Sequence, residues 1–77
     1  MSAKQHEREL KMIGLNIAYY RKLKGLSQLQ LAEKVQISRT HISNIEAPNA
    51  QTQLSLETLL DIADALEITP DNLLIFR

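Results

Sequence analysis

The sequence predicts an all-α fold of five helices, in which the second and third helices are joined by a very short turn. Three observations predict it. Apolar residues recur every three or four positions over most of the chain, which is the period of an amphipathic helix. Serines, which are preferred helix N-caps, precede three of these periodic segments. The chain has only two glycines and two prolines to interrupt helices, and no stretch alternates as a half-buried strand does.

The first two helices are indicated by a period, a glycine and a capping box. The first period begins near residue 10, with its apolar positions at Leu10, Ile13, Ile17 and Tyr20. Gly25 suits the left-handed residue that often ends a helix. Ser27 and Gln30 then have the spacing of a capping box, in which each side chain meets a backbone amide that has no helical partner. The apolar positions of the second helix, which we expect to be buried, are Leu31, Ala32 and Val35.

The third helix is expected at about residues 38–46, with Ser38 as its cap. Ile42 and Ile45 give it a narrow apolar stripe, and polar side chains cover its other face. Only residues 36–37 separate it from the second helix. Two helices joined so closely must cross steeply, which is the geometry of a helix-turn-helix.

The remaining segments are a loop and two further helices. Residues 47–54 have no period and contain Pro48, so they predict a loop. Ser55 caps the fourth helix. The apolar period of that helix consists of Leu56, Leu59, Leu60, Ala63 and Leu66. Thr69 as a cap, followed by Pro70 at the first helical position, predicts a last short helix. The apolar residues of that helix are Leu73 and Leu74.

Length and composition restrict the class of protein. At 77 residues the chain has room for one domain with a single apolar core. It has no cysteine, which excludes disulfides and thiolate metal sites and favours a cytoplasmic location. No apolar run approaches the roughly 20 residues that span a bilayer, and the polar N-terminus is unlike a signal peptide. We expect residues 1–9 to be an N-terminal extension that frays and residues 10–77 to be the domain.

The charge is divided along the chain although the formal net charge is zero. Residues 1–46 hold eight Lys or Arg and four Glu, whereas residues 47–77 hold one Arg and five Asp or Glu. Such asymmetry favours one face that meets a polyanion and another that is turned away from it. Ordinary scatter of charges is the alternative.

A set of short motifs recurs in order from about Ile13 to Leu74. The residues are Ile13-Gly14, Ile17, Arg21-Lys22, Gly25-Leu26-Ser27-Gln28, Leu31-Ala32, Ile37-Ser38, Ile42-Ser43, Ile45-Glu46, the run from Ser55 to Leu60, Ile62-Ala63 and Ala65-Leu66. Each motif is weak alone, but the ordered set at this spacing is specific. In it the chain resembles the lambda-repressor-like, XRE-type helix-turn-helix family of phage repressors. The resemblance implies a sequence-specific regulator of transcription, with repression as the expected mode, that binds double-stranded DNA through the helix at 38–46.

The resemblance also assigns base contacts. Arg39, Thr40 and Asn44 fall where family members read bases. The chemistry fits, because an arginine can bond the O6 and N7 atoms of guanine in pairs and an asparagine can bond adenine likewise. The alternative for each is a solvated side chain on the helix surface.

Phosphate contacts and an ion pair follow from the same resemblance. Ser38 and Ser43 fall where phosphates are often touched, and Gln28 falls where a phosphate is anchored beside a helix N-terminus. Ser38 is a helix cap in either reading. Arg21 and Glu46 match an ion pair that ties the first helix to the end of the recognition helix, a structural role rather than a DNA contact.

Other classes of site have little support. His41 has no cluster of ligands around it in the sequence, so we expect no metal, no cofactor and no catalytic residue. The chain departs from the family in two places: Gln36 stands where glycine is usual in the turn, and the loop after Glu46 is longer and lacks lysine and arginine. The alternative function is a protein-interaction module, or an antitoxin-like partner, with weak or no DNA binding.

A single domain of this kind covers few base pairs, so family members bind inverted repeats as two-fold dimers. Ile75 and Phe76 are apolar residues beyond what one short helix needs to bury. We expect them to form a homodimer contact, the alternative being that both close the core of the monomer. Leu15, Tyr19 and Leu29 are a second exposed apolar set.

Overall fold

The computed structural model describes residues 6–49 and 52–76. Within these ranges the helices are α1 (Glu7–Leu23), α2 (Gln28–Val35), α3 (Arg39–Glu46), α4 (Leu56–Ala65) and the short 3-10 helix η2 (Pro70–Leu74). The described ranges contain no strand, so the all-α prediction is confirmed. The first helix begins at Glu7, three residues earlier than its apolar period indicated. The rest of the predicted N-terminal extension, residues 1–5, lies outside the described residues, as do residues 50, 51 and 77.

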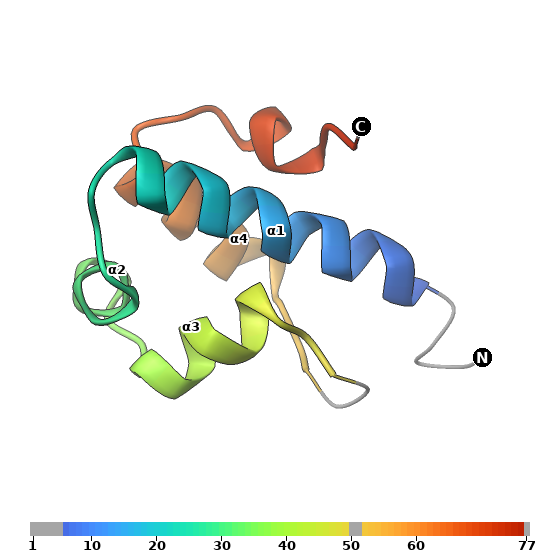
Figure 1. Cartoon of the computed structure of the whole chain (residues 1–77), viewed down its shortest axis with the longest axis horizontal. Coiled ribbons are helices and arrows are strands. Elements are labelled where there is room, and N and C mark those ends of the chain that lie inside the picture. The colour runs from blue at the N-terminus through green and yellow to red at the C-terminus, as the bar shows by residue number, and fades with distance from the viewer. Residues whose placement is uncertain (1–5, 50–51, 77) are drawn as a thin grey trace.

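Helix α1 crosses the whole molecule and packs against α3 and η2, while α2 packs against α3 and α4 (Figure 1). In that view α3 lies on one side of α1 and η2 on the other, and α4 runs behind it. The fully buried side chains come from every helix, since Ile17, Leu31, Ile42, Ile62, Leu66 and Leu73 are all inaccessible. One apolar core therefore fixes all five elements. No helix in the described part of the chain is long and apolar enough to cross a bilayer.

Serine side chains begin α2, α3 and α4 as the sequence predicts. Ser27, Ser38 and Ser55 each accept a hydrogen bond from the backbone N–H three residues later. At α2 the backbone N–H of Ser27 in turn donates to the side-chain oxygen of Gln30, at 2.8 Å, which completes the capping box. Each cap satisfies an amide that the helix leaves without a partner.

The last helix differs from the prediction. It is a 3-10 helix of five residues, not an α-helix. Its first turn is closed by a hydrogen bond from the Asn72 N–H to the Thr69 carbonyl, at 3.1 Å. The Thr69 side chain caps no backbone amide, because its hydroxyl accepts from the Asn72 side chain instead, at 2.9 Å. Thr69 therefore occupies the predicted N-cap position without capping the helix through its side chain, and Pro70 begins the helix as predicted.

A side chain of α1 holds this C-terminal segment. Asn16 Nδ2 donates to the carbonyls of Leu73 and Ile75, both at 3.0 Å. Leu73 is buried and Phe76 packs partly buried against the core, whereas Ile75 is 44% exposed. Phe76 thus contributes to the monomer, and Ile75 remains accessible.

The apolar period of α4 was predicted too broadly. Leu59 and Ala63 are buried as expected, but Leu56 and Leu60 are 70% and 41% exposed. The buried face includes Ile62 instead, because the helix docks on α2 and η2 along one narrow stripe.

Three helices end in the same way. The last turns of α1, α2 and α4 each close with a residue of positive φ: Gly25 at 72°, Gln36 at 63° and Glu67 at 59°. In each, the N–H of the next residue donates to the carbonyl five residues earlier, as that of Leu26 does to Arg21 at 3.1 Å. This is the Schellman motif, which usually carries glycine at the left-handed position. The residues that follow, Leu26, Ile37 and Ile68, pack against the core.

The left-handed positions give a paired prediction about stability. Gly25→Ala should lower the free energy of unfolding by about 1 kcal/mol, because alanine has a Cβ that the left-handed backbone disfavours. Gln36→Gly should raise the free energy of unfolding by up to about 1 kcal/mol, because it removes a Cβ from a left-handed residue. The gain is reduced by the conformational entropy that glycine adds to the unfolded chain. Urea unfolding followed by circular dichroism measures both. Equal signs for the two changes would contradict a backbone origin.

A glycine lets α1 approach the end of α3. A Cβ built on Gly14 would lie 2.5 Å from the Ile45 carbonyl oxygen and 2.8 Å from that of Glu46. Both neighbours are backbone atoms, so the helices would have to separate. Gly14 therefore sets the distance between α1 and α3.

Gly14→Ala tests this contact through the sign of its effect. Helix propensity alone predicts a gain of about 1 kcal/mol for alanine inside a helix. The steric clash predicts instead a loss of about 1–3 kcal/mol in the free energy of unfolding. Thermal or urea unfolding distinguishes the two, and a gain in stability would show that α1 and α3 are not in tight contact.

Candidate nucleic-acid interface

The outer face of α3 carries the residues predicted to read bases. Ile42 and Ile45 are buried beneath the helix, which leaves the opposite side outward. Arg39, Thr40 and Asn44 are all exposed on that side. A helix that is apolar below and rich in donors above has the form needed to enter a major groove.

The residues predicted to touch phosphate surround this face. Ser38 is exposed at the first turn of α3, and its oxygen already accepts from His41 N–H at 3.0 Å. Its hydroxyl proton remains available to an acceptor, because a hydroxyl both accepts and donates. Ser43 and Gln28 are half-buried, the latter at the first residue of α2.

Arg21 and Glu46 form a two-pronged ion pair between α1 and the last residue of α3. Arg21 Nε lies 2.6 Å from Glu46 Oε2, and Nη2 lies 3.1 Å from Oε1. The two side chains are only 10% and 6% exposed. Arg21 Nη1 also donates to the Leu26 carbonyl at 2.8 Å, and no buried side-chain polar atom among the described residues lacks a partner. The pair is thus desolvated, but each of its nitrogen and oxygen atoms has a hydrogen-bond partner, the condition under which a buried pair is tolerated.

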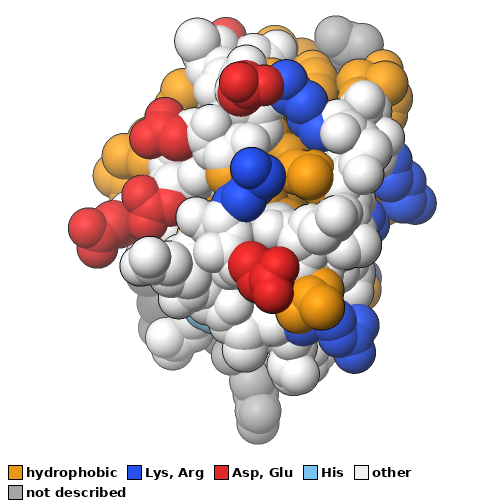
Figure 2. Space-filling model, turned by 90° about the vertical axis from the view of Figure 1, so that its left-hand side faces the viewer, with side chains coloured by type: hydrophobic (Ala, Val, Ile, Leu, Met, Phe, Trp, Pro, Cys, Tyr) orange, Lys and Arg blue, Asp and Glu red, His pale blue; other side chains and the backbone are white. Residues whose placement is uncertain are grey.

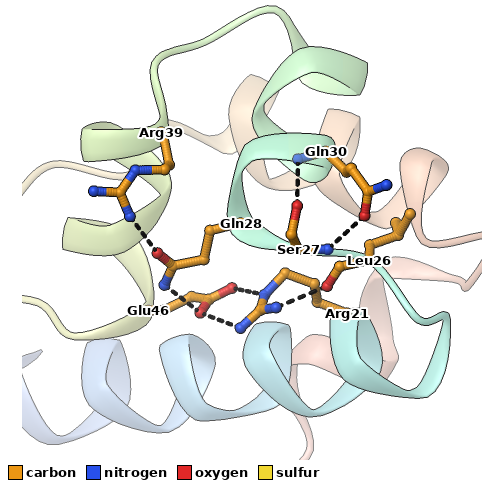
Figure 3. A network of polar contacts seen from close by, with 7 residues as sticks. All are labelled: Arg21, Leu26, Ser27, Gln28, Gln30, Arg39 and Glu46. Atoms are coloured by element: carbon orange, nitrogen blue, oxygen red, sulfur yellow. Dashed lines mark hydrogen bonds and ion pairs between the residues drawn. The ribbon is translucent and has the colours of Figure 1, made fainter.

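The contacts continue from this pair to the outer face of α3 (Figure 3). Gln28 Nε2 donates to Glu46 Oε1 at 3.0 Å. Arg39 Nη1 donates to Gln28 Oε1 at 3.2 Å. The structure therefore joins a predicted phosphate contact to a predicted base contact and to the ion pair. Sequence reasoning missed this link, because a contact between the first residues of α2 and α3 depends on how the two helices cross.

A polar groove lies beside α3 and was not predicted. Its volume is about 410 Å³, and it is lined by His41, Asn44, Thr52, Gln53, Ser55 and Thr58. His41 Nε2 lies 3.5 Å from the Gln53 carbonyl oxygen across this groove. In the described ranges no group of three or more His, Cys, Asp or Glu residues is placed to hold a metal ion. The surroundings of His41 are therefore those of a hydrogen-bonded surface side chain.

The outer face of α3 carries no exposed carboxylate of its own helix. The acidic residue of α3, Glu46, is held in the ion pair. On α4, Glu57, Asp61 and Asp64 are exposed. Figure 2 shows the end of the molecule that α2 occupies, where several acidic side chains gather at one edge and Lys and Arg predominate at the other. The face offered by α3 is thus free of exposed carboxylates from its own helix.

The ends of α1 and α4 are linked on the exposed surface. Lys24, the residue directly after α1, donates a hydrogen bond to the carboxylate of Glu67, which lies two residues after the end of α4. This hydrogen bond and the charge of the ammonium lower the pKa of the Glu67 carboxyl. Both side chains are solvated, so the pair contributes little to stability.

Comparison with known proteins identifies the same type of domain. A family model described as helix-turn-helix matches residues 17–73. The transcriptional regulator SinR of Bacillus subtilis is 40% identical over 63 residues, which is 82% of this chain and 56% of that protein. The chain therefore spans little more than half the length of the curated relatives it matches.

Solved structures share this fold over most of the chain. The restriction-modification controller protein C.AhdI of Aeromonas hydrophila superposes with a TM-score of 0.80 at 33% identity, covering 90% of this chain and 97% of that one. SinR, described as the master regulator for biofilm formation and solved in complex with DNA, gives 0.73 at 38% identity, covering 82% and 98%. The arrangement of α1 to η2 is thus shared with these regulators.

The ion pair gives a prediction that a double-mutant cycle can measure. Arg21→Met or Glu46→Leu alone should lower the free energy of unfolding by about 3–5 kcal/mol, because each leaves a buried charge without its partner. The double variant should lose much less than the sum of the two, since no charge is then left unpaired. Urea unfolding of the three variants provides the cycle. Additive losses would mean that the two side chains are not coupled.

Proposed function

This chain belongs to the lambda-repressor-like helix-turn-helix family, and from that premise we propose that it is a sequence-specific DNA-binding domain of a transcriptional regulator. The observation that carries the proposal is the outer face of α3, where Arg39, Thr40 and Asn44 are exposed above a fully buried stripe. The major groove of B-DNA admits one α-helix and presents a distinct donor and acceptor pattern at each base pair. The chain acts by occupying its site, with repression as the expected result, and performs no catalysis.

The proposed phosphate contacts fit around this helix. Ser38 and Ser43 flank the reading face with hydroxyl donors. Gln28 uses one of its two Nε2 protons for Glu46, which leaves the second for a phosphate oxygen at the start of α2. These contacts set the register of the domain on the duplex and carry no sequence information themselves.

Two copies are expected on one operator. A pair of such domains binds half-sites about one helical turn apart, roughly 10 base pairs. We assign the contact between copies to Ile75, which is 44% exposed beside a hollow of about 360 Å³ on α1, together with the part of Phe76 that its packing on the core leaves accessible. The hollow is lined by Met12, Leu15, Asn16, Tyr19, Tyr20, Asn72 and Ile75.

A regulator of this kind works in the cytoplasm.

A protein-interaction role is the second candidate. The observation in its favour is the stretch between α3 and α4, residues 47–55, which has no lysine or arginine to approach the DNA backbone. Together with a net charge of zero, this predicts a shallow dependence of DNA affinity on salt.

Selection from a pool of random duplex DNA at near-physiological salt tests the proposal. We expect an inverted repeat to be enriched. Arg39→Ala should then weaken binding to that repeat by about 1–3 kcal/mol and remove the preference at one base pair, as loss of a two-pronged contact does. Lys22→Ala, which removes an exposed positive charge from α1, is the matched control and should keep every preference.

The contrary result is equally informative. Folded protein that enriches no sequence, even at low salt, would contradict DNA recognition. It would favour the protein-interaction role.

A further inference from the structure

A histidine lines the polar groove beside α3, and the other described residues of its lining are uncharged. This residue, His41, is half-buried and shares the lining with Asn44, a predicted base contact. We propose that protonation of His41 controls a contact between this groove and a DNA phosphate, so that the affinity for DNA rises as the pH falls. The proposal rests on the proposed function and adds a pH dependence to the same interface.

His41 lies on the flank of α3. It precedes Asn44 by three residues and Ile45 by four, which places it between the outer face of the helix and its buried stripe. An α-helix is about 10–12 Å across and the major groove is about 12 Å wide, so the flanks of an inserted helix face the sugar-phosphate strands. Because Asn44 also lines the polar groove, DNA that Asn44 reads passes over the mouth of the groove. A phosphate is therefore the part of the DNA that His41 meets.

The carbonyl of Gln53 decides what a neutral His41 offers to DNA. His41 Nε2 lies 3.5 Å from this oxygen, which only accepts hydrogen bonds, so the proton of the neutral ring belongs on Nε2. Nδ1 has no hydrogen-bond partner among the described residues, and in the neutral ring it carries a lone pair. A phosphate oxygen also only accepts, so the neutral ring offers it no bond at Nδ1. Protonation places an N–H on Nδ1 and a positive charge on the ring, and both attract the phosphate.

No carboxylate lines the described part of the polar groove to offset that charge. Residues 47–55 include no charged side chain, and α1 and α2, which also pack against α3, add none to the described lining. The charged residues of the two helices that bound the groove are Arg39 and Glu46 on α3 and Glu57, Asp61 and Asp64 on α4. None of these lines the groove, and Glu46 is already paired with Arg21. A protonated His41 thus keeps its charge available to a phosphate.

Binding of DNA and binding of a proton at this site favour each other. Imidazole is the side chain that ordinarily gains its proton between about pH 8 and pH 5. Because DNA binds the protonated ring better than the neutral ring, complex formation takes up a proton, and the affinity rises as the pH falls. The protonated ring also neutralises one further phosphate, so the affinity then falls more steeply with salt.

The test measures affinity for the selected operator from about pH 8 to about pH 5.5 at constant ionic strength. The wild type should bind about three- to tenfold more tightly at the acid end. Its slope of log affinity against log salt should steepen there by about one. His41→Gln has no group to titrate at this position and should show neither change. His6→Gln is the matched control, since it removes the other histidine of the chain and should keep the full pH dependence.

A phosphate contact requires the same gain on every sequence, because phosphates carry no sequence information. Single-base variants of the operator should therefore gain as much affinity at low pH as the operator itself. A pH effect confined to one base pair would assign His41 to base reading and overturn the phosphate contact.

A second measurement needs no variant. The ring signals of His41, followed by nuclear magnetic resonance, should titrate at a higher pH in the complex with operator DNA than in the free protein. Those of His6 should titrate alike in both. An unchanged titration of His41 would contradict the proposal even if His41→Gln failed to fold.

The outcomes separate this inference from the proposed function. Folded protein that enriches no sequence contradicts DNA recognition before the pH is varied. A wild type that binds its operator with the same affinity across the pH range, or a pH dependence that persists in His41→Gln, would overturn the role of His41 while leaving DNA recognition in place.

Discussion

The placement of α3 depends on the ion pair between Arg21 and Glu46. Both side chains are almost completely removed from water, and every nitrogen of the guanidinium and both oxygens of the carboxylate have a hydrogen-bond partner in the protein. Such a pair restricts the movement of α3 against α1, because separating the two side chains would leave each charge buried without its partner. Gly14 sets the closeness of the same two helices, so charge and backbone contact fix one geometry together. The core then fills the space that this geometry leaves.

The sequence was most informative where structure is decided by neighbours in the chain. The serine caps and the left-handed Gly25 were all predicted, because each depends on residues within one turn. The candidate face of α3 was predicted for the same reason, since Ile42 and Ile45 define its buried side.

Sequence reasoning failed where the outcome depends on packing between distant segments. Leu60 follows the period of α4 but is exposed, because only the docking of α4 on α2 and η2 decides how wide its buried stripe is. Asn16 gave no signal in the sequence, although it binds two carbonyls more than fifty residues away. The amide of Gln28 was assigned to phosphate by resemblance, and its two protein partners emerged only when α1, α2 and α3 were placed together.

The shared form of the three helix ends bears on how quickly this chain can fold. Each end closes within a few residues and returns an apolar residue, Leu26, Ile37 or Ile68, to the core. The turns are thus specified by short-range contacts, and domains dominated by such contacts fold in microseconds to milliseconds because little loop entropy is lost in forming them. The contact of Asn16 with the carbonyl of Ile75 spans 59 positions and is of the opposite kind. On the ribosome, α1 can therefore acquire its partner α3 early, whereas its C-terminal partner has to wait until residue 75 has been made.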